Sequence, residues 1–158
     1  MGQQGRKIVS IDLKDLIKDL NKAYCDEWLA YYSYLYMAKT VTGKGYEDIS
    51  EFLEKIAKDE IEHAQELADR ILELGGTPID NPTELEKNAN APYPKPPKDT
   101  SDYDKIVKIV LDAEAGAIDV YNKIAQKTLG KDHATYQLIC HILGEEIKHE
   151  EMFEDILE

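Results

Sequence analysis

The chain of 158 residues lacks the features that would place it in a membrane or outside the cell. It has no apolar run near the roughly 20 residues that a membrane-spanning helix needs. No stretch combines a basic start, an apolar core and a small-residue cleavage site. The sequence therefore predicts a cytoplasmic protein of about one domain, with no membrane partner.

Basic side chains are scarce relative to acidic ones. Lys and Arg number 19 against 32 Asp and Glu, which gives a net charge of -13. Nucleic-acid surfaces are normally basic, and Arg6 and Lys7 are too few to form a basic arm. Direct DNA binding is therefore not expected. The negative net charge is consistent with attraction of cations, and equally with a charged surface that only keeps the protein soluble.

Cysteine is also rare. Cys25 and Cys140 are far apart in the chain and form no Cys-x-x-Cys or other close-spaced metal or redox motif. We interpret them as two small buried thiols in a reducing cytosol.

Proline is absent from most of the chain, because all six prolines lie in residues 75–102. No long helix survives that density. On either side, apolar residues recur at helical spacing, with Gly43, Gly45, Gly75, Gly76 and Gly130 as breaks. This pattern predicts long helices at about 13–42, 46–74, 103–129 and 133–157, with Ser10 or Asp12 capping the first and Asp132 the last. Residues 1–10 are expected to form a flexible tail.

The segment 75–102 is too long for a simple turn between helices. Antiparallel neighbours need only about 2 to 8 linking residues, so this length lets the chain return along the bundle and makes the second and third helices parallel. It leaves room for a short helix at about 82–88, with Asn81 as cap and Pro82 at the first helical position. We predict an all-α protein: one four-helix bundle of two antiparallel hairpins over residues 11–158, joined by a long crossover.

Charged residues interrupt the apolar stripe of every predicted long helix. They are Glu27, Glu60, His63, Glu114, Glu146 and His149. A Glu-x-x-His motif occurs twice, at 60–63 and 146–149, and this spacing puts both side chains on one helix face. Glu27 precedes the first motif by 33 residues and Glu114 precedes the second by 32. The chain therefore resembles an internal two-fold repeat.

Two tyrosines follow the same repeat. Tyr34 lies seven residues after Glu27, and Tyr121 lies seven after Glu114. Seven residues make about two helical turns, so each hydroxyl is expected on the face of its glutamate. Each tyrosine can equally be a packed core residue.

Three interpretations of these residues compete. Solvated helix faces do not explain charged groups in apolar stripes. A metal-free polar core would bring four carboxylates together, with strong repulsion and desolvation. Two divalent cations would balance four glutamates, with two neutral histidines completing the ligand set. Carboxylate and imidazole ligands suit Fe or Mn.

This arrangement, one Glu from each of two helices and Glu-x-x-His from the other two, resembles the ferritin-like superfamily over residues 11–157. The six residues are similar to the ferroxidase centre of bacterioferritins. The resemblance implies two Fe ions per subunit, with Mn or Zn as substitutes, bridged by Glu60 and Glu146 and held terminally by Glu27 and Glu114. It also implies that the hydroxyls of Tyr34 and Tyr121 hold carboxylates in place.

Departures from the family pattern narrow the resemblance. Ile61 stands where bacterioferritins carry a haem-binding methionine, so no haem is expected. Nothing follows Glu158, so we expect no fifth helix and no 24-subunit shell. The proline-rich segment and the final helix look most like Dps-like proteins, which form 12-subunit cages. Many of those carry a cysteine where this chain has Gly116 and another in the crossover, which here has none.

We therefore expect a di-iron ferroxidase that oxidises Fe(II) with H₂O₂ or O₂ and stores the iron in a homo-oligomeric cage, protecting against oxidative stress. Charged residues near the motifs would guide iron or simply face solvent: Glu62, Glu66, Glu145 and Glu150. The alternative is a rubrerythrin-like peroxidase or manganese-catalase-type enzyme without storage, and a third reading is DNA coating. The sequence leaves open the native metal, the preferred oxidant and the cage size.

Overall fold

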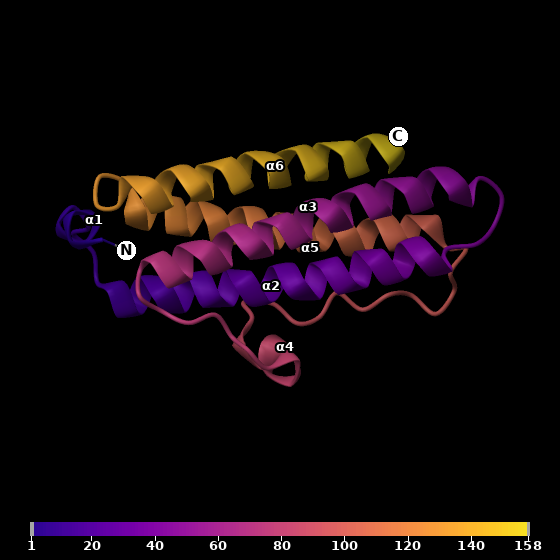
Figure 1. Ribbon diagram of the computed structural model, residues 1–158. Helices are drawn as coiled ribbons and strands as arrows, with labels where there is room; N and C mark the ends of the chain where they lie inside the picture. The colour runs from indigo at the N-terminus through magenta and orange to yellow at the C-terminus, as the bar shows by residue number, and fades with distance from the viewer. Residues whose placement is uncertain (1, 158) are drawn as a thin grey trace.

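The computed structural model describes residues 2–157, and all the regular structure in that range is helical. The helices are α1 (Gln3–Lys7), α2 (Leu13–Thr40), α3 (Tyr46–Glu73), η1 (Pro82–Glu84), α4 (Leu85–Asn88), α5 (Tyr103–Thr128) and α6 (His133–Leu157). The four long helices α2, α3, α5 and α6 lie alongside one another as a bundle (Figure 1). The predicted all-α four-helix bundle is confirmed.

Short polar residues start three of the four long helices. Asp12 accepts a hydrogen bond from the Asp15 backbone N–H at 2.9 Å. Asp102 does the same for Lys105 at 3.1 Å, and Asp132 for Thr135 at 3.2 Å. Each aspartate satisfies an N–H that has no partner inside the helix. The predicted caps Asp12 and Asp132 are therefore present.

Glycine ends α3 because the chain there turns through the left-handed region. Gly75 has a φ of 88°, and the N–H of Gly76 donates to the carbonyl of Ile71 at 2.9 Å. A residue without a Cβ adopts this conformation at little cost, which explains why the helix ends at Glu73, with Leu74 as its C-cap.

The long helices form two antiparallel hairpins, α2 with α3 and α5 with α6. In Figure 1, α2 and α6 run in one direction, and α3 and α5 run in the other. The second and third long helices are therefore parallel, as the length of segment 75–102 predicts.

The crossover between the hairpins lies along α2. The Asn21 side chain donates to the carbonyl of Thr77 at 3.1 Å. Further along α2, Asp26 accepts from the N–H of Asn90 at 2.8 Å, and the Ser33 hydroxyl donates to the carbonyl of Pro94. Residues later in the crossover contact residues later in α2, so the crossover runs in the same direction as α2. It contains the short helical stretch expected at 82–88, and the Asn81 side chain accepts from the N–H of Thr83 at 3.0 Å.

Residues 1–10 contain one feature that the sequence did not predict. The segment expected to be a flexible tail includes the five-residue helix α1, and the N–H of Ser10 donates to the carbonyl of Lys131 at 2.9 Å. This bond ties the end of the segment to the α5–α6 turn. Flexibility of the segment stays a prediction.

The buried apolar side chains divide into two clusters along the bundle axis. One contains Tyr34, Leu53, Val110 and Phe153, and the other contains Leu20, Leu67, Tyr121 and Ile142, among others. On each long helix the predicted metal ligands fall between the two clusters. The candidate site is therefore a polar layer enclosed by apolar packing at both ends.

Within residues 2–157, none of the helices is long and apolar enough to cross a membrane.

A buried ion pair ties α3 to the start of α6. The Arg70 guanidinium donates to both carboxylate oxygens of Asp132, at 3.0 and 2.9 Å, and to the Thr135 hydroxyl at 2.8 Å. Arg70 is 6% exposed and Asp132 is 3% exposed. Despite burial, bonds from Thr135 and Arg70 hold the pKa of Asp132 below its usual value.

We expect Asp132→Ala to lower the free energy of unfolding by about 3 to 5 kcal/mol, because it removes the buried carboxylate partner of Arg70, leaves only the exposed Glu73 beside that charge, and removes the cap of α6. The measurement is urea denaturation at matched protein concentration. Lys87→Ala, which removes an exposed partner of Glu84, is the control and should change stability by less than about 0.5 kcal/mol. Equal effects of the two substitutions would contradict this role.

Candidate metal centre

The structure brings all six predicted site residues together in the middle of the bundle. Glu27 comes from α2, the pair Glu60 and His63 from α3, Glu114 from α5, and the pair Glu146 and His149 from α6. All six are at most 3% exposed. Chain segments as distant as the first and last long helices therefore meet in one buried polar layer.

Within residues 2–157, the side chains form two four-residue groups that could each hold a cation. One group is Glu27, Glu60, His63 and Glu146, and the other is Glu60, Glu114, Glu146 and His149. In each group the candidate ligand atoms all lie within 4.8 Å of one another. Glu60 and Glu146 belong to both groups, which is the geometry required of carboxylates that bridge two ions.

The two imidazoles face the carboxylates with their Nδ1 atoms. His63 Nδ1 lies 2.9 Å from Glu146 Oε1 and 3.6 Å from Glu60 Oε2. His149 Nδ1 lies 3.5 Å from both Glu114 Oε2 and Glu146 Oε2. The rings themselves are stacked, with centroids 6.1 Å apart.

Several of these inward-facing atoms are buried without a hydrogen bond of proper geometry. They are Nδ1 of both histidines, Oε1 of Glu60, Oε2 of Glu114 and Oε1 of Glu146. Buried polar atoms normally have a hydrogen-bond partner. Buried atoms that lack one and point into the same space are typical of ligands that bind a metal ion. Carboxylate oxygens and imidazole nitrogens fit Fe, Mn or Zn.

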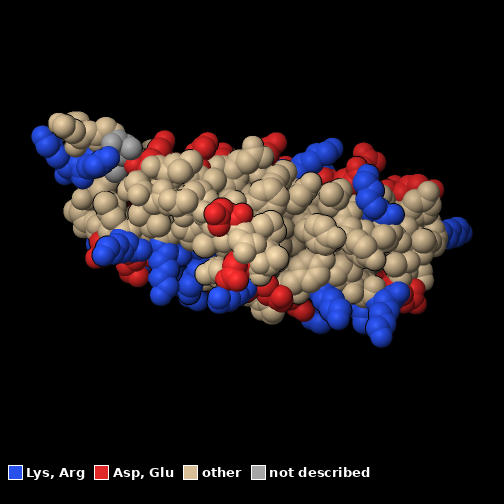
Figure 2. Space-filling view, turned by 60° about the horizontal axis from the view of Figure 1, so that its bottom comes forward, with Lys and Arg blue, Asp and Glu red and all other residues tan. Residues whose placement is uncertain are grey.

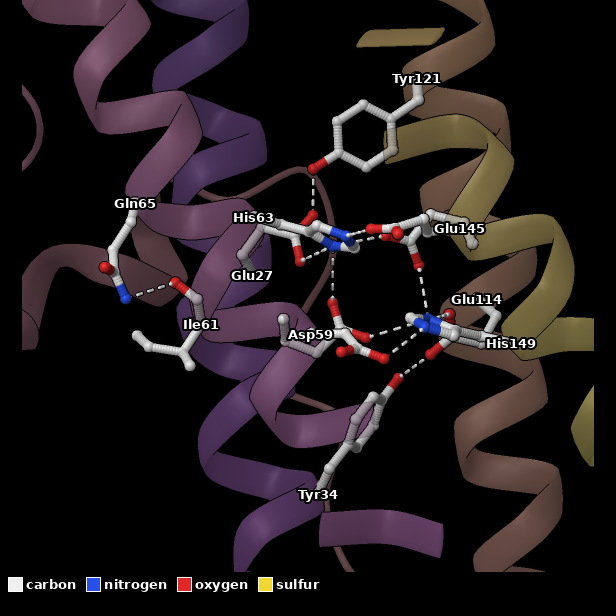
Figure 3. A network of polar contacts seen from close by, with 12 residues as sticks. Glu27, Tyr34, Asp59, Ile61, His63, Gln65, Glu114, Tyr121, Glu145 and His149 are labelled. Atoms are coloured by element: carbon white, nitrogen blue, oxygen red, sulfur yellow. Dashed lines mark hydrogen bonds and ion pairs between the residues drawn. The ribbon is translucent and has the colours of Figure 1, made fainter. Parts of the chain in front are cut away.

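The two tyrosine hydroxyls bind glutamates, but each binds the glutamate of the other hairpin. Tyr34 donates to Glu114 Oε1 at 2.7 Å, and Tyr121 donates to Glu27 Oε1. Figure 3 shows the tyrosines on opposite sides of the centre. The sequence placed each hydroxyl on the face of its own helix's glutamate, and only the packing of the hairpins decides which carboxylate it reaches.

Two further acidic residues hold the outer nitrogens of the histidines. Glu145 Oε2 lies 2.8 Å from His63 Nε2, and Asp59 Oδ2 lies 3.3 Å from His149 Nε2 (Figure 3). Such contacts fix the ring so that the other nitrogen points to the metal. Asp59 was not predicted from the sequence, and Glu145 was predicted only to guide iron or to face solvent. The available signal was an acidic residue directly before the glutamate of each motif.

In the metal-free protein, burial and mutual repulsion raise the pKa of two of the glutamates. Burial, together with Glu146 and Glu27, holds the pKa of Glu60 well above its usual value. Burial and Glu146 raise the pKa of Glu114 to about 8. Both carboxyl groups are therefore easier to protonate than an exposed glutamate when no cation is bound.

The histidines show the opposite balance. Burial lowers the pKa of His149, but its contacts with Glu114, Glu146 and Glu60 outweigh this and raise the pKa to about 12. The same kind of contact with Glu146, Glu27 and Glu60 raises the pKa of His63. Although burial opposes it, the two histidines lower the pKa of Glu146 to about 2. Protons thus carry the compensating charge that two divalent cations would otherwise supply.

We expect the melting temperature of the metal-free protein to fall as pH rises from about 5 to 8. Glu114 has its pKa raised from 4.5 to about 8 on folding, so its stabilising proton is present below pH 4.5 and is lost as pH approaches 8. Raised pKa values of Glu60 and the histidines act in the same direction.

Thermal melts in chelating buffer check this expectation, and Glu114→Gln should flatten the slope. Saturation with a divalent cation should flatten it too, because bound ions replace the protons. A melting temperature that rises over this range would contradict the assignment.

Residues 17–158 match the family model described as the ferritin-like domain, and the chain therefore belongs to that family. Among curated proteins, it is 36% identical over 163 residues to the DNA protection during starvation protein of Pyrococcus furiosus, an alignment that covers 99% of this chain and 86% of the relative.

Solved structures agree with this assignment. A bacterioferritin-related protein of Bacteroides fragilis, described as a dodecameric thioferritin, is 38% identical with a TM-score of 0.89, covering 93% of this chain and 86% of that one. Dps from Thermosynechococcus elongatus, at 18% identity and a TM-score of 0.85 over 92% of each chain, shows the shared fold. The predicted membership of the ferritin-like superfamily and the likeness to Dps proteins are confirmed.

Proposed function

We propose that the protein is a di-iron ferroxidase that oxidises Fe(II) with H₂O₂ or O₂ and stores the iron in an oligomeric cage. The observation that carries this proposal is the pair of four-residue groups that share Glu60 and Glu146. A single metal site would not need two carboxylates placed in both groups, whereas two ions close together do.

Iron is the substrate of this reaction. Two Fe(II) ions give two electrons to one H₂O₂, which with two protons becomes two water molecules, and the iron leaves as Fe(III). Glu27 and His63 would bind one ion and Glu114 and His149 the other, with Glu60 and Glu146 between them. Mn or Zn would be held by the same ligands. We propose no haem, because Ile61 stands where a haem-binding methionine would be.

The surrounding residues would keep this ligand set in place. Tyr34 and Tyr121 each occupy one oxygen of a terminal glutamate, which leaves the other oxygen for iron. Asp59 and Glu145 hold the outer nitrogens of the histidines. These four contacts support a site whose ligands are already positioned when iron arrives.

The ferroxidase proposal predicts that Glu60→Ala abolishes fast iron oxidation, since it removes a carboxylate from both groups. The protein is loaded anaerobically with two Fe(II) per subunit and mixed with H₂O₂ or O₂, and Fe(III) formation is followed by stopped-flow absorbance. We expect a loss larger than the roughly 10–100-fold cost of removing an outer partner of a metal ligand.

Glu62→Ala is the matched control, because Glu62 lies two residues away on the same helix and is exposed. It should oxidise iron at the parent rate. If Glu60→Ala kept that rate as well, the intrasubunit centre would not be the site of oxidation.

Storage requires a hollow assembly, and we propose a homododecamer in the cytoplasm. The 38%-identical Bacteroides fragilis relative is described as dodecameric, which supports this size. The net charge of -13 argues against direct DNA binding, although the Pyrococcus furiosus relative is named for DNA protection.

Native mass spectrometry should therefore give a particle of 12 subunits, and iron added with oxidant should remain inside it in excess of two ions per subunit. A dimer or tetramer that turns over peroxide without retaining iron would instead favour a rubrerythrin-like peroxidase or a manganese-catalase-type enzyme.

A further inference from the structure

A cavity of about 320 Å³ leads to the candidate metal centre from the side of the bundle where the crossover lies. Its floor includes the four glutamates of the centre, and its walls come from α2 and α5. Residues 90–95 of the crossover form its roof. The metal centre is thus buried but reachable from one side.

Apart from the glutamates of the floor, three charged residues line the cavity, Asp26, Lys95 and Asp112, and its other lining residues are uncharged. Leu29 and Ala30 line it from α2, and Ile109, Ala113 and Val120 line it from α5. Figure 2 shows that the molecular face bearing the crossover is largely uncharged, with a few acidic side chains near its middle and the other charged side chains toward its edges. A hydrated divalent cation loses favourable solvation in such a passage, whereas a small neutral molecule does not.

The opposite side of the centre has a different character. His63 and His149 face outward there onto Glu145 and Asp59, whose side chains are 35% and 34% exposed. Cations are attracted to carboxylates of this kind. The apolar cavity is therefore suited to the other reactant, the oxidant.

The roof of the cavity is attached to α2. Asp26 accepts hydrogen bonds from the backbone N–H of Asn90 at 2.8 Å and of Ala91 at 3.1 Å, and the Ser33 hydroxyl donates to Pro94. Between residues 90–95 and α5 no hydrogen bond is found in the described part of the chain. In the described residues, hydrogen bonds therefore attach the roof to α2 but not to α5.

Gly116 lies on this side, two residues after Glu114, and lines the cavity. A Cβ built on Gly116 meets no atom within 4 Å. Gly116 is exposed, so it lies at the mouth of the cavity and a larger side chain has room there. The missing side chain at this position contributes to the width of the opening.

We infer that this cavity is the route by which a small uncharged oxidant, H₂O₂ or O₂, reaches the metal centre, and that the size of residue 116 determines its access. The inference rests on the proposed ferroxidase function and names the path of one substrate. Gly116 acts through the space it leaves open and contacts neither iron nor its ligands.

The test compares Gly116→Ala, Gly116→Leu and Gly116→Phe in the assembled protein. Ala115→Phe is the matched control, because Ala115 is the adjacent exposed residue on α5 and does not line the cavity. Each variant is first titrated anaerobically with Co(II), whose visible spectrum reports whether the centre still binds two ions. Iron oxidation is then measured separately with H₂O₂ and with O₂.

We expect the oxidation rate to fall in the order Gly, Ala, Leu, Phe, with a loss of about tenfold or more for Gly116→Phe once access limits the reaction. Co(II) binding should stay unchanged, and Ala115→Phe should match the parent. A loss with only one oxidant identifies the molecule that uses the route. If Gly116→Phe fails to bind Co(II), the oxidation rate of Gly116→Leu is compared with that of the parent instead.

A second measurement does not depend on iron chemistry. Crystals of the metal-free protein under xenon pressure should hold xenon in the cavity of the parent and not in Gly116→Phe, because apolar cavities take up apolar gas. Equal oxidation rates of the parent and Gly116→Phe with both oxidants, or a parent cavity without xenon, would overturn the inference and leave the ferroxidase function standing. A parent protein that binds Co(II) but oxidises no iron would refute the ferroxidase function itself.

Discussion

The structure depends on the burial of four carboxylates in one small space. Repulsion and desolvation make that arrangement unfavourable on its own. The protein compensates with two imidazoles that carry protons when no metal is present, as the raised pKa values of His63 and His149 show. Such a layer lowers the stability of the metal-free fold. Its presence at the centre of the core is therefore explained by binding of cations rather than by stability.

The apolar packing on both sides makes this layer tolerable. One hydrophobic cluster lies toward the α2–α3 turn and the other toward the α5–α6 turn, so the polar layer is confined to the middle of each helix. The ion pair between Arg70 and Asp132 adds a specific contact at one end. Rigid surroundings keep the ligands close to the positions that two cations require, and the crossover leaves one side of the layer accessible.

Much of the fold and the centre could be predicted from the sequence, because both rest on local spacing. Apolar periodicity and the confinement of proline to 75–102 gave the four helices and the crossover. The three-residue spacing within each motif, together with Glu27 and Glu114 at matching distances before the motifs, predicted the six residues that meet in the centre. Helix caps such as Asp132 followed from short-range rules as well.

The features that escaped prediction depend on how the two hairpins are rotated against each other. Tyr121 and Glu27 are 94 residues apart, and His149 and Asp59 are 90 apart. No spacing rule reaches over such distances. On its own helix, Asp59 lies four residues before His63, so a local rule would have paired it with the wrong imidazole. Helix α1 was also missed, because five residues give too little periodicity to recognise.

Exchange of contacts between the hairpins has a consequence for how the centre forms. Tyr34 and Asp59 support residues of the second hairpin, while Tyr121 and Glu145 support residues of the first. Each hairpin thus carries half of the ligands and the supports for the other half. Neither hairpin alone holds a positioned set of ligands, so the centre exists only when the two hairpins are packed together.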